Sequence, residues 1–366
     1  MLDIDLPRHI APDVLDRKLA EGWFRSGPVL LRADVLPIDE RIHGLQHVRR
    51  PLGDEAPSRN QRKLLRRNRE RFHCEIGPVE IRSAQRRLYE ATKPRFTGFV
   101  CSRLSDLILG NPIVHVDRLE CRVFDGERLV AASYMDVGRD SVASQLALHD
   151  PDYARFSLGF YTLLEEIEYA RSTGRRYFYP GYVVPGLSTF DYKLRVGPLE
   201  YLDRAGRWRR RARPPRRLRH AEHQRGRLAA LGRALAREGL AAERRFYPGF
   251  WLGHFHALAE LTADYARHMV HYRCVDAREA DEWVIVEYDG EADDYVMSRV
   301  RADDDIDFQE GMDPVEPADR SSEAHIAQPG VAEDGLNEFR ALVYASQPLR
   351  SDSAAEIALA ARRALA

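Results

Sequence analysis

IVHVDRLECRVFDGERLVAASYMDV, residues 113–137, predicts two strands joined at Asp125-Gly126, because an Asp-Gly pair between apolar runs favours a hairpin. SVASQLALHD (141–150) predicts a third strand, and LGFYTLLEEIEYARSTG (158–174) predicts an amphipathic helix that a glycine ends. The β-prone run RRYFYPGYVV (175–184) predicts a further strand, interrupted by its Pro-Gly step. Three strands, a helix and a strand indicate the α+β class.

The length of 366 residues allows two to three domains, and 44% hydrophobic with 31% charged residues predicts a soluble, folded protein. No run reaches the roughly 18 to 20 apolar residues of a bilayer span, and MLDIDLPRHI lacks the basic start and apolar run of a signal peptide. We therefore expect a cytoplasmic protein with no membrane partner. We divide the chain into a small N-terminal domain (1–56), a central α+β domain (57–203) and a basic linker with a C-terminal extension of unknown role (204–366).

The cysteines and acidic runs do not form a metal motif. The four cysteines are far apart and include no CxxC, so neither a disulfide framework nor a zinc knuckle is indicated. His268, His271 and Cys274, with His254 and His256 upstream, have a spacing that could seat zinc, but no Cys pair supports it. The acidic run 303–307 lacks the glycine and terminal glutamate of a calcium loop. We expect no metal and no bound cofactor.

Charge is unevenly distributed, although the net charge is only -1. Residues 58–71 hold seven basic side chains and one acid, and residues 204–245 hold fifteen Arg and three Glu. Residues 276–334 reverse this with twenty acids and four Arg. The basic blocks favour an anionic partner such as nucleic acid, and the acidic block is a segment that could cover them. The alternative is a solvated surface in an Arg-rich chain.

Other segments predict the remaining elements. Helices are expected at 11–23, with Asp13 as the cap, at 58–72, capped by Ser58 or Asn60, and at 79–93, 225–246, 251–274 and 353–366. Strands are expected within 26–38, and a hairpin at 282–301 around Asp289-Gly290. The Pro- and Arg-rich stretch 204–220 predicts an exposed basic linker, and 303–323 predicts irregular structure.

The run 149–202 resembles the C-terminal half of the aminoacyl-tRNA-protein transferases, which are the arginyltransferases and their bacterial leucyltransferase relatives. The pieces that match follow the family's order and are Asp150-Pro151-Asp152-Tyr153, Ser157-Leu158-Gly159 with Tyr161, Gly181-Tyr182, Tyr192-Lys193 and Pro198. PSRNQRKLLRRN (57–68) is similar to the family's basic helix, and LDRKLAEGWFRSG (15–27) to its opening segment. The resemblance covers about residues 10 to 203.

This chain departs from the family pattern at two places. Where members carry an N-terminal cysteine cluster, it has RADVLPIDERIHG (32–44) without cysteine, so a metal there is not expected. The approach to the Tyr-Lys pair is Gly186-Leu187-Ser188-Thr189-Phe190-Asp191 instead of a Cys-x-Lys-Met type, which leaves the acceptor preference open.

The resemblance implies an acetyltransferase-like (GNAT-like) core that uses charged tRNA. An acyl-CoA enzyme needs a Gly-rich turn at the start of its central helix to hold pyrophosphate, and here residues 155–159 hold one glycine. Aminoacyl-tRNA, read by Arg and Lys side chains and by aromatic stacking, is the expected co-substrate. The basic stretch 207–219, with Trp208 among its arginines, is a further candidate contact.

The candidate catalytic residues are Tyr182, Tyr192 and Lys193. Lys193, one of four Lys beside fifty-two Arg, would place a charge on a tRNA phosphate or on the developing oxyanion, and the tyrosines would donate hydrogen bonds or stack on the terminal base. Either tyrosine could equally be core. Asp150, Asp152 and Asp191 are possible proton acceptors, although a turn role explains the first two, and no base is assigned. The expected substrate and tRNA contacts are Arg59, Gln61, Arg62, Lys63, Arg66, Arg67, Ser157 and Gly159.

The leading hypothesis is transfer of an aminoacyl group, with arginine favoured narrowly over leucine, from charged tRNA to the free amine of a protein or peptide. The resemblance implies an acceptor that begins with Asp or Glu, and a dedicated peptide or natural-product acceptor is a variant of the same reading. A non-catalytic tRNA- or RNA-binding protein and an acetyl-CoA-dependent N-acetyltransferase are the alternatives.

Overall fold

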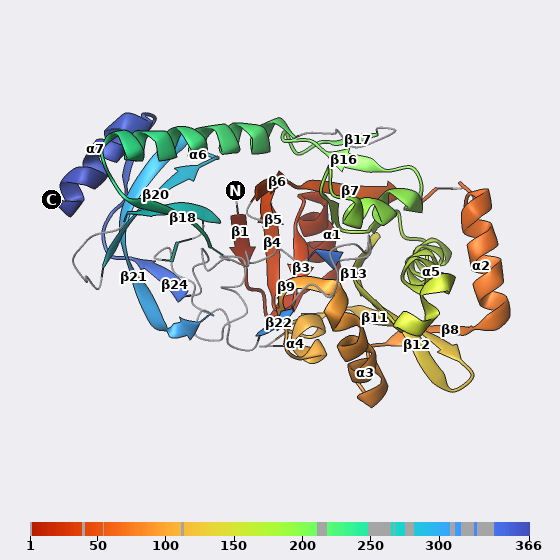
Figure 1. Ribbon diagram of the computed structural model, residues 1–366. Coiled ribbons are helices and arrows are strands. Elements are labelled where there is room, and N and C mark those ends of the chain that lie inside the picture. Colours follow the sequence, from red (N-terminus) through yellow and green to blue (C-terminus); the bar gives the residue numbers. More distant parts are fainter. Residues whose placement is uncertain are drawn as a thin grey trace.

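The computed structural model describes residues 2–38, 41–53, 55–110, 113–210, 218–247, 265–266, 268–274, 282–307, 312–315, 326–327 and 340–366. Within these residues a sheet of nine strands carries the centre of the fold (Figure 1). Its order is β17-β16-β7-β14-β13-β12-β11-β8, and β15 pairs with β7. The strands are β7 (Gln46–Pro51), β8 (His73–Pro78), β11 (Arg118–Asp125), β12 (Arg128–Val137), β13 (Ser141–His149), β14 (Tyr177–Tyr179), β15 (Tyr182–Val183), β16 (Glu200–Leu202) and β17 (Trp208–Arg210).

The stretch that decides the fold class forms the elements predicted for it. Strands β11 and β12 form the antiparallel hairpin around Asp125-Gly126, and β13 pairs with β12. Helix α5 (Leu158–Ser172) then crosses to β14, which pairs parallel with β13. The α+β class is confirmed.

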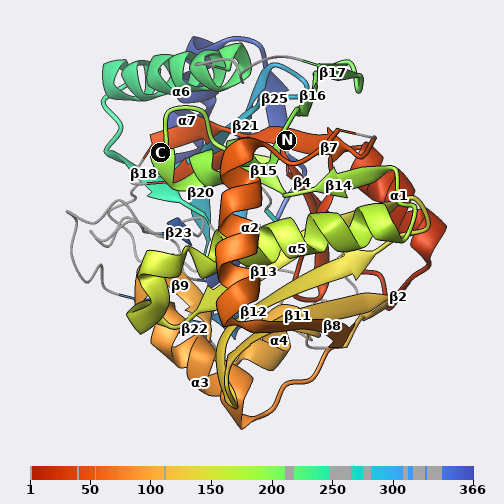
Figure 2. The same cartoon turned by 90° about the vertical axis from the view of Figure 1, so that its right-hand side faces the viewer.

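Helices cover both faces of this sheet. Alternate residues of β12 point to opposite faces, so Ala131 and Met135 pack in the same apolar cluster as α5, whereas Ala132 and Tyr134 pack with α3 (Ser83–Thr92). Helix α2 (Arg59–Arg71) crosses over α5, on the face of the sheet that α5 covers (Figure 2). Ser58 caps α2 and forms a capping box with Gln61, which confirms one of the two predicted caps. Short elements complete this part, namely η1 (Lys93–Arg95), α4 (Leu104–Ile108), η2 (Pro151–Phe156) and η3 (Ser188–Val196).

The N-terminal residues form a small sheet in the order β1-β4-β3 and the strand pair β5-β6, and β2 pairs with β10 from the central range of the sequence. Helix α1 (Pro12–Ala20) buries Leu15 and Leu19 as predicted, but the Asp13 cap is wrong: the N-cap is Ala11, and no side chain caps it. Asp13 instead pairs with Arg17 one turn along. The strands are β1 (Leu2–Asp5), β2 (His9–Ile10), β3 (Phe24–Ser26), β4 (Val29–Ala33), β5 (Val35–Ile38), β6 (Arg41–Gly44) and β10 (His115–Val116).

The central sheet takes strands from each of the three ranges into which we divided the sequence. Strand β7 belongs to residues 1–56, yet it pairs with β14 and β16. Strand β17, from the stretch expected to be an exposed linker, pairs with β16. The N-terminal range therefore contributes directly to the sheet that holds the central helix α5.

A second sheet, in the order β18-β19-β20-β21-β24 with β25 on β21, forms the C-terminal part. Helices α6 (Arg219–Arg237) and α7 (Ala354–Leu365) pack against it, and α6 runs across the top of the molecule in Figure 1. The predicted hairpin at 282–301 and the C-terminal helix are confirmed. The strands are β18 (Ala242–Phe246), β19 (Val270–Cys274), β20 (Trp283–Asp289), β21 (Asp294–Asp307), β24 (Arg340–Tyr344) and β25 (Leu349–Ser351).

Three predictions for the C-terminal part are wrong. The helix expected over 225–246 ends at Arg237, because Gly239 adopts a positive φ of 72° and the chain re-emerges as β18. Residues 270–274, expected at the end of a helix from 251, form β19, and residues 251–264 lie outside the described residues. Residues 303–307, expected to be irregular, complete β21, and the short strands β22 (Met312–Val315) and β23 (Ile326–Ala327) pair with β9 (Phe96–Cys101).

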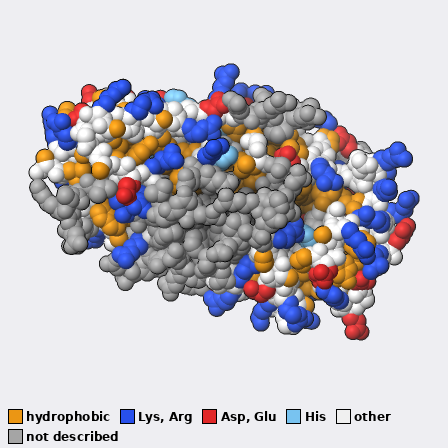
Figure 3. All heavy atoms as spheres, in the orientation of Figure 1, with side chains coloured by type: hydrophobic (Ala, Val, Ile, Leu, Met, Phe, Trp, Pro, Cys, Tyr) orange, Lys and Arg blue, Asp and Glu red, His pale blue; other side chains and the backbone are white. Residues whose placement is uncertain are grey.

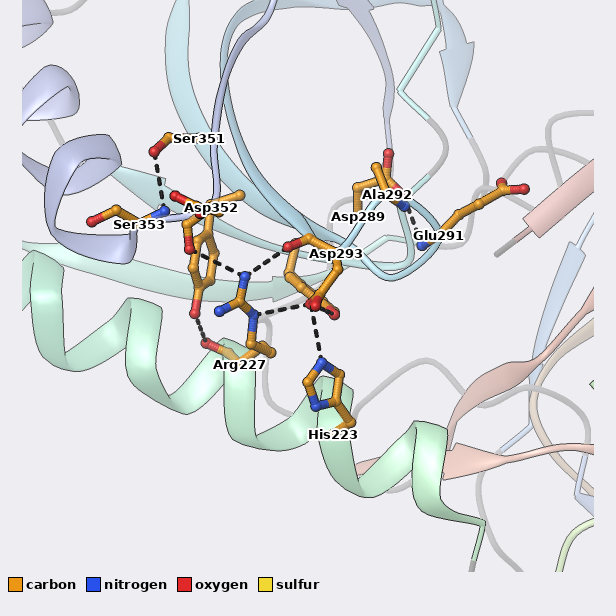
Figure 4. Close-up of polar contacts among 11 residues, drawn as sticks. His223, Arg227, Asp289, Glu291, Ala292, Asp293, Ser351, Asp352 and Ser353 are labelled. Carbon is orange, nitrogen blue, oxygen red and sulfur yellow. Dashed lines mark hydrogen bonds and ion pairs between the residues drawn. The ribbon is translucent and has the colours of Figure 1, made fainter.

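Arg227 fixes α6 to the turn of the β20–β21 hairpin (Figure 4). Its Nη2 donates to the main-chain oxygens of Asp293 and Asp352, at 2.7 and 3.2 Å. The guanidinium also lies 4.3 Å from the ring centre of Tyr295. Asp293 adopts a φ of 60°, unusual for a residue with a side chain, and its carboxylate accepts hydrogen bonds from Tyr288 and His223. These contacts join the Arg-rich helix to the C-terminal sheet.

None of the described helices is long and apolar enough to cross a membrane.

Candidate functional site

A pocket of about 550 Å³ opens where β13 and β14 separate. The two strands pair only over Ser141–Ala143 of β13, which then continues beside β12 to His149. Residues 144–147 and His149 of β13 line the pocket instead of pairing with β14, and Ala143, the last paired residue, also lines it. Further walls come from the end of α1, from β3 and β7, from the start of α5 and from η3.

The start of α5 faces this pocket, and it contains both residues that the sequence singled out there. Ser157 adopts a left-handed φ of 54° and precedes the helix, and Gly159 is its second residue. A β-carbon at Gly159 would lie 3.5 Å from Nδ1 of His149, an ordinary contact distance. The helix therefore presents its N-terminus, which carries partial positive charge, at the pocket.

Lys193 enters the pocket from η3. Its Nζ donates a hydrogen bond to the main-chain oxygen of Tyr182 at 3.1 Å and lies 4.9 Å from the centre of that ring. The rings of Phe190 and Tyr192 are 5.5 and 5.9 Å away. Burial lowers the pKa of the Lys193 ammonium to about 8. The charge of Lys193 is thus held by aromatic faces and a carbonyl, a setting in which a substrate anion gains most from it.

The two candidate tyrosines differ in exposure. The ring of Tyr182 packs against Phe24 of β3 and Phe190 of η3, at centroid distances of 5.1 and 5.5 Å. Tyr192 is 37% exposed and also lines the pocket. Burial raises the pKa of both phenols above the usual value, so both remain hydrogen-bond donors at neutral pH.

Two histidines and an arginine of the pocket were not singled out in the sequence. Arg95 contacts the His149 ring with its Nη1, 3.1 Å from Nδ1, and burial, with Arg95, lowers the pKa of His149 to about 4. His47 lies 3.2 Å from the carbonyl oxygen of Ala33 through Nε2, and burial lowers its pKa to about 4. Both imidazoles are therefore neutral at pH 7. His47 and Arg95 lie on distant segments, and no local motif marks them.

A buried ion cluster supports the wall that β3 provides. Arg25 donates from Nε and Nη2 to the Asp136 carboxylate, at 2.6 and 3.0 Å, and Arg118 donates to the same carboxylate at 3.2 Å. Arg25 also donates to the carbonyl oxygens of Gly27 and Ile108. Because Asp136 offsets its charge, Arg25 can stay buried and connect β3 to β12 and α4 through its hydrogen bonds.

The pocket has a positive character. Among the described residues that line it, Arg95 and Lys193 lack a carboxylate partner in contact, and none of the lining residues is Asp or Glu. The remaining lining residues are mostly aromatic, aliphatic or small. Such a pocket favours a negatively charged group beside an apolar one.

Comparison with known proteins gives the same family as the motifs. The family profile "Arginine-tRNA-protein transferase, C terminus" matches residues 71–203. An aspartate/glutamate leucyltransferase of Caulobacter vibrioides is 30% identical over 230 residues, which cover 58% of this chain and 79% of the relative. One from Leptospira interrogans is 27% identical over 192 residues, 51% of this chain and 73% of the relative. The chain belongs to the aminoacyl-tRNA-protein transferase family.

A solved structure gives a weaker likeness. The C-terminal domain of a protein described as a lysylphosphatidylglycerol synthetase, from Agrobacterium fabrum, aligns with a TM-score of 0.31 and 15% identity. The alignment covers 38% of this chain and 46% of that chain.

The matched family segment contains most of the pocket, whereas the basic helix α2 begins before it. Lys and Arg side chains gather over the end of the molecule that α2 forms (Figure 3). The α2 side chains predicted to contact tRNA do not line the pocket, and all but one are exposed: Arg59, Arg62, Lys63, Arg66 and Arg67. The exception is Gln61, which is buried and donates to the carbonyl oxygen of Arg195 at 2.7 Å, so it ties α2 to η3.

Other residues that the sequence suggested as functional make contacts within the fold. Asp150 caps η2, accepting from the Asp152 amide, and pairs with Arg128, which supports the turn role. Trp208 packs on Tyr179 at the pocket and donates to the carbonyl oxygen of Ala20. Residues 211–217 of the basic stretch 207–219 lie outside the described residues. Just before β19, His268 pairs with Glu287 of β20, and the described part of the chain shows no group of three metal-ligating side chains.

Proposed function

We propose that the protein transfers an aminoacyl group from charged tRNA to the free α-amine of a protein or peptide, with the reaction in the pocket between β13 and β14. The observation that carries the proposal is the pocket itself, which joins Lys193, Arg95 and the N-terminus of α5 in a setting without lining carboxylates among the described residues. Family membership supports the use of aminoacyl-tRNA.

The topology supports a GNAT-like core for residues 57–203. Strands β13 and β14 are parallel, joined by α5, and separate beyond three residue pairs, which opens a site at the start of the helix. Residues 155–159, which lead into the first turn of α5, hold a single glycine, Gly159, so they lack the Gly-rich cradle expected for the pyrophosphate of coenzyme A. Side chains such as Arg95 would instead meet the terminal phosphate of the tRNA.

The lining favours a neutral donor side chain. An arginyl group needs a carboxylate to offset its guanidinium, and the described lining offers Leu107, Ile108, Leu146 and Leu163 but no Asp or Glu. We therefore propose leucyl or a similar apolar group in place of arginyl, the donor narrowly favoured by the sequence. The curated relatives are described as leucyltransferases, which agrees with this choice.

The same charges favour an acidic acceptor. No carboxylate of the described residues contacts Lys193 in the pocket, so an Asp or Glu side chain at the acceptor's N-terminus gains a partner there. The relatives' description as aspartate/glutamate leucyltransferases supports this assignment. A peptide that presents one such terminus on a larger molecule would satisfy the same contacts.

The chemistry needs alignment more than activation, because the aminoacyl ester is already reactive. The acceptor nitrogen attacks the ester carbon, the new amide bond forms, the ester C–O bond breaks, and the proton that leaves nitrogen is balanced by one that reaches the ribose oxygen. The phenols of Tyr182 and Tyr192 and the amides at the start of α5 are donors that would stabilise the oxyanion. The exposed cations of α2 would hold the tRNA backbone outside the pocket.

The test is transfer of labelled amino acids from bulk charged tRNA to peptides that differ only in an N-terminal Asp, Glu, Lys, Arg or Ala. We expect leucine, or another apolar residue, on the Asp and Glu peptides, at rates that fall as salt rises. Arginine on these peptides would overturn the donor assignment, and equal labelling of all peptides would overturn the acceptor assignment. tRNA binding without any transfer would indicate a binding protein, and a thermal shift with coenzyme A but not with tRNA would indicate an acetyltransferase.

A further inference from the structure

Glu166 is a buried carboxyl group that the proposed mechanism does not yet use. It lies on α5 and is fully buried, and among the described residues neither carboxylate oxygen has a hydrogen-bond partner of ordinary geometry. Burying a carboxyl group in this way is costly, and a fold tolerates it only where packing or function compensates. The position therefore calls for a role.

Its place on α5 brings it beneath the pocket. Gly159, Phe160 and Leu163 of α5 line the pocket, and Glu166 follows Leu163 by three residues on the same face of the helix. The surface below it is the α5 face of β12 and β13, where Ser133 and Ser144 lie close enough to act on its carboxyl group. Ser144 itself lines the pocket.

The β13 strand is irregular at this point. The pairing of β12 with β13 shifts between Tyr134 and Met135, which leaves Gln145 as the extra residue next to Ser144. The bulge lies just past Ala143, where pairing with β14 ends and β13 borders the pocket, and such irregularities re-aim side chains beside functional sites. Ser144 is thus placed between the buried carboxyl group and the pocket.

We propose that Glu166, acting through the Ser144 hydroxyl, holds the proton that leaves the acceptor nitrogen during transfer. This inference rests on the proposed function. The N–C bond forms as the ester C–O bond breaks; the proton on nitrogen passes through Ser144 to the Glu166 carboxylate, and Glu166 returns a proton to the ribose oxygen, so the carboxylate is regenerated. Glu166 is a positioning residue for this proton, because it acts through Ser144.

The electrostatic surroundings agree with this role. Burial raises the pKa of Glu166 to about 8, against the opposing effect of Ser133 and Ser144. The titratable groups that interact with it are Tyr192 of η3 and Cys121 of β11, both neutral at pH 7. A proton acceptor whose pKa lies near that of an α-amine is well matched to the transfer.

The experiment compares Glu166→Gln with the wild type on one acceptor peptide from pH 6 to 9.5. Because the titration of the peptide amine and of the other groups is common to both enzymes, it cancels in the ratio of the two kcat values. We expect the variant to lose about 10²-fold in kcat at pH 8.5, with KM for the acceptor within twofold of the wild type. The ratio of the wild-type kcat to the variant kcat should grow as pH rises through 8. A ratio that is flat with pH, or equal rates, would overturn the inference.

Ser144→Ala provides a second variant if Glu166→Gln does not fold. We expect it to lower kcat by a similar factor, and the double variant to lose no more than the worse single variant, because the two residues act as one relay. Independent, multiplicative losses would contradict the relay. A wild type that transfers nothing would reject the proposed function, whereas a wild type that transfers and a Glu166→Gln variant that matches it would reject only the inference.

Discussion

The Nζ atom of Lys193 lies 3.1 Å from the point that a β-carbon at Gly181 would occupy. Gly181 precedes Tyr182, whose carbonyl accepts the hydrogen bond from this ammonium, and it adopts a φ of 94°. The absence of a side chain at Gly181 therefore does two things: it permits the left-handed turn, and it leaves room for the Lys193 ammonium at the pocket.

Gly181→Ala is expected to lower both stability and activity. The left-handed φ costs an alanine about 1–2 kcal/mol, and the new methyl group displaces the Lys193 ammonium. Gly186→Ala is a matched control, since Gly186 has a φ of 95° and no atom within 4 Å of the added β-carbon. Thermal unfolding should show similar losses for the two variants, while aminoacyl transfer falls at least tenfold further in Gly181→Ala. Equal activities would show that the space beside Lys193 has no role in transfer.

Lys193→Ala is expected to separate transfer from tRNA binding. If the ammonium acts on substrate charge inside the pocket, its loss lowers kcat by about 10²–10³-fold, while the exposed cations of α2 keep the tRNA affinity within a few-fold. The ammonium is protonated below its pKa of about 8 and neutral above it, so the Lys193-dependent part of the rate falls as pH rises beyond 8. Steady-state kinetics and filter binding test these points. A proportional loss of binding and transfer would assign Lys193 to tRNA affinity alone.

Much of the centre of the fold could be predicted because its signals are local. The Asp-Gly turn at 125–126, the amphipathic helix after Ser157 and the β-prone run after it each follow from a short stretch of sequence, and the structure contains all three. The site residues Lys193, Tyr182 and Gly159 came from family motifs within the same region. The pocket contains these three because the strands on either side of α5 are parallel and separate beside its first turn.

The site residues that the sequence did not reveal reach the pocket through contacts between segments that are far apart in the chain. His47 reaches the pocket through β7, a strand that joins the sheet next to β14, and Arg25 reaches it through β3 and a salt bridge to Asp136, 111 residues away. In the sequence, Glu166 is one of three Glu in LLEEIEYA (163–170), and its burial follows from the packing of α5 on β12 and β13. At 270–274 the run VHYRC is too short for its apolar spacing to separate a helix from a strand, and pairing with β18 and β20 makes it a strand.

Removing charge from α2 is expected to weaken tRNA binding without sequence preference. The triple variant Arg62→Ala, Lys63→Ala, Arg66→Ala removes exposed side chains that do not line the pocket. Each lost phosphate contact lowers the slope of log K against log salt by roughly 0.7 to 0.9, so the slope should decrease by about 2 to 3. Binding measured between 50 and 300 mM salt gives the slope. An unchanged slope would mean that these side chains form an ordinary solvated helix face.

Asp136→Asn is expected to be strongly destabilising. The carboxylate is fully buried between Arg25 and Arg118, and the substitution leaves two buried cations without their counter-charge, at a cost of about 3–5 kcal/mol. Asp3→Asn is the control, because Asp3 pairs with Arg32 at 2.6 Å but both side chains are about one-third exposed, and such pairs contribute at most about 1 kcal/mol. Urea unfolding of both variants measures the difference. Similar losses of stability in the two variants would contradict the role assigned to Arg25 and Asp136 in holding the pocket wall in place.

Glu166 makes a prediction about stability that is independent of any substrate. Burial raises its pKa from the ordinary glutamate value of 4.5 to about 8 in the folded protein, so between these values the native state binds a proton that the unfolded chain does not. The free energy of unfolding therefore falls as pH rises from about 4.5 to 8, with a contribution of up to about 1.4 kcal/mol per pH unit. Glu166→Gln removes this contribution, since the amide does not titrate. Urea unfolding at pH 6 and pH 8.5 should show the variant gaining stability relative to the wild type at the higher pH. A difference between the two proteins that is the same at both pH values would show that the carboxyl group is already ionised in the folded protein, which would also remove the proton-holding role assigned to it.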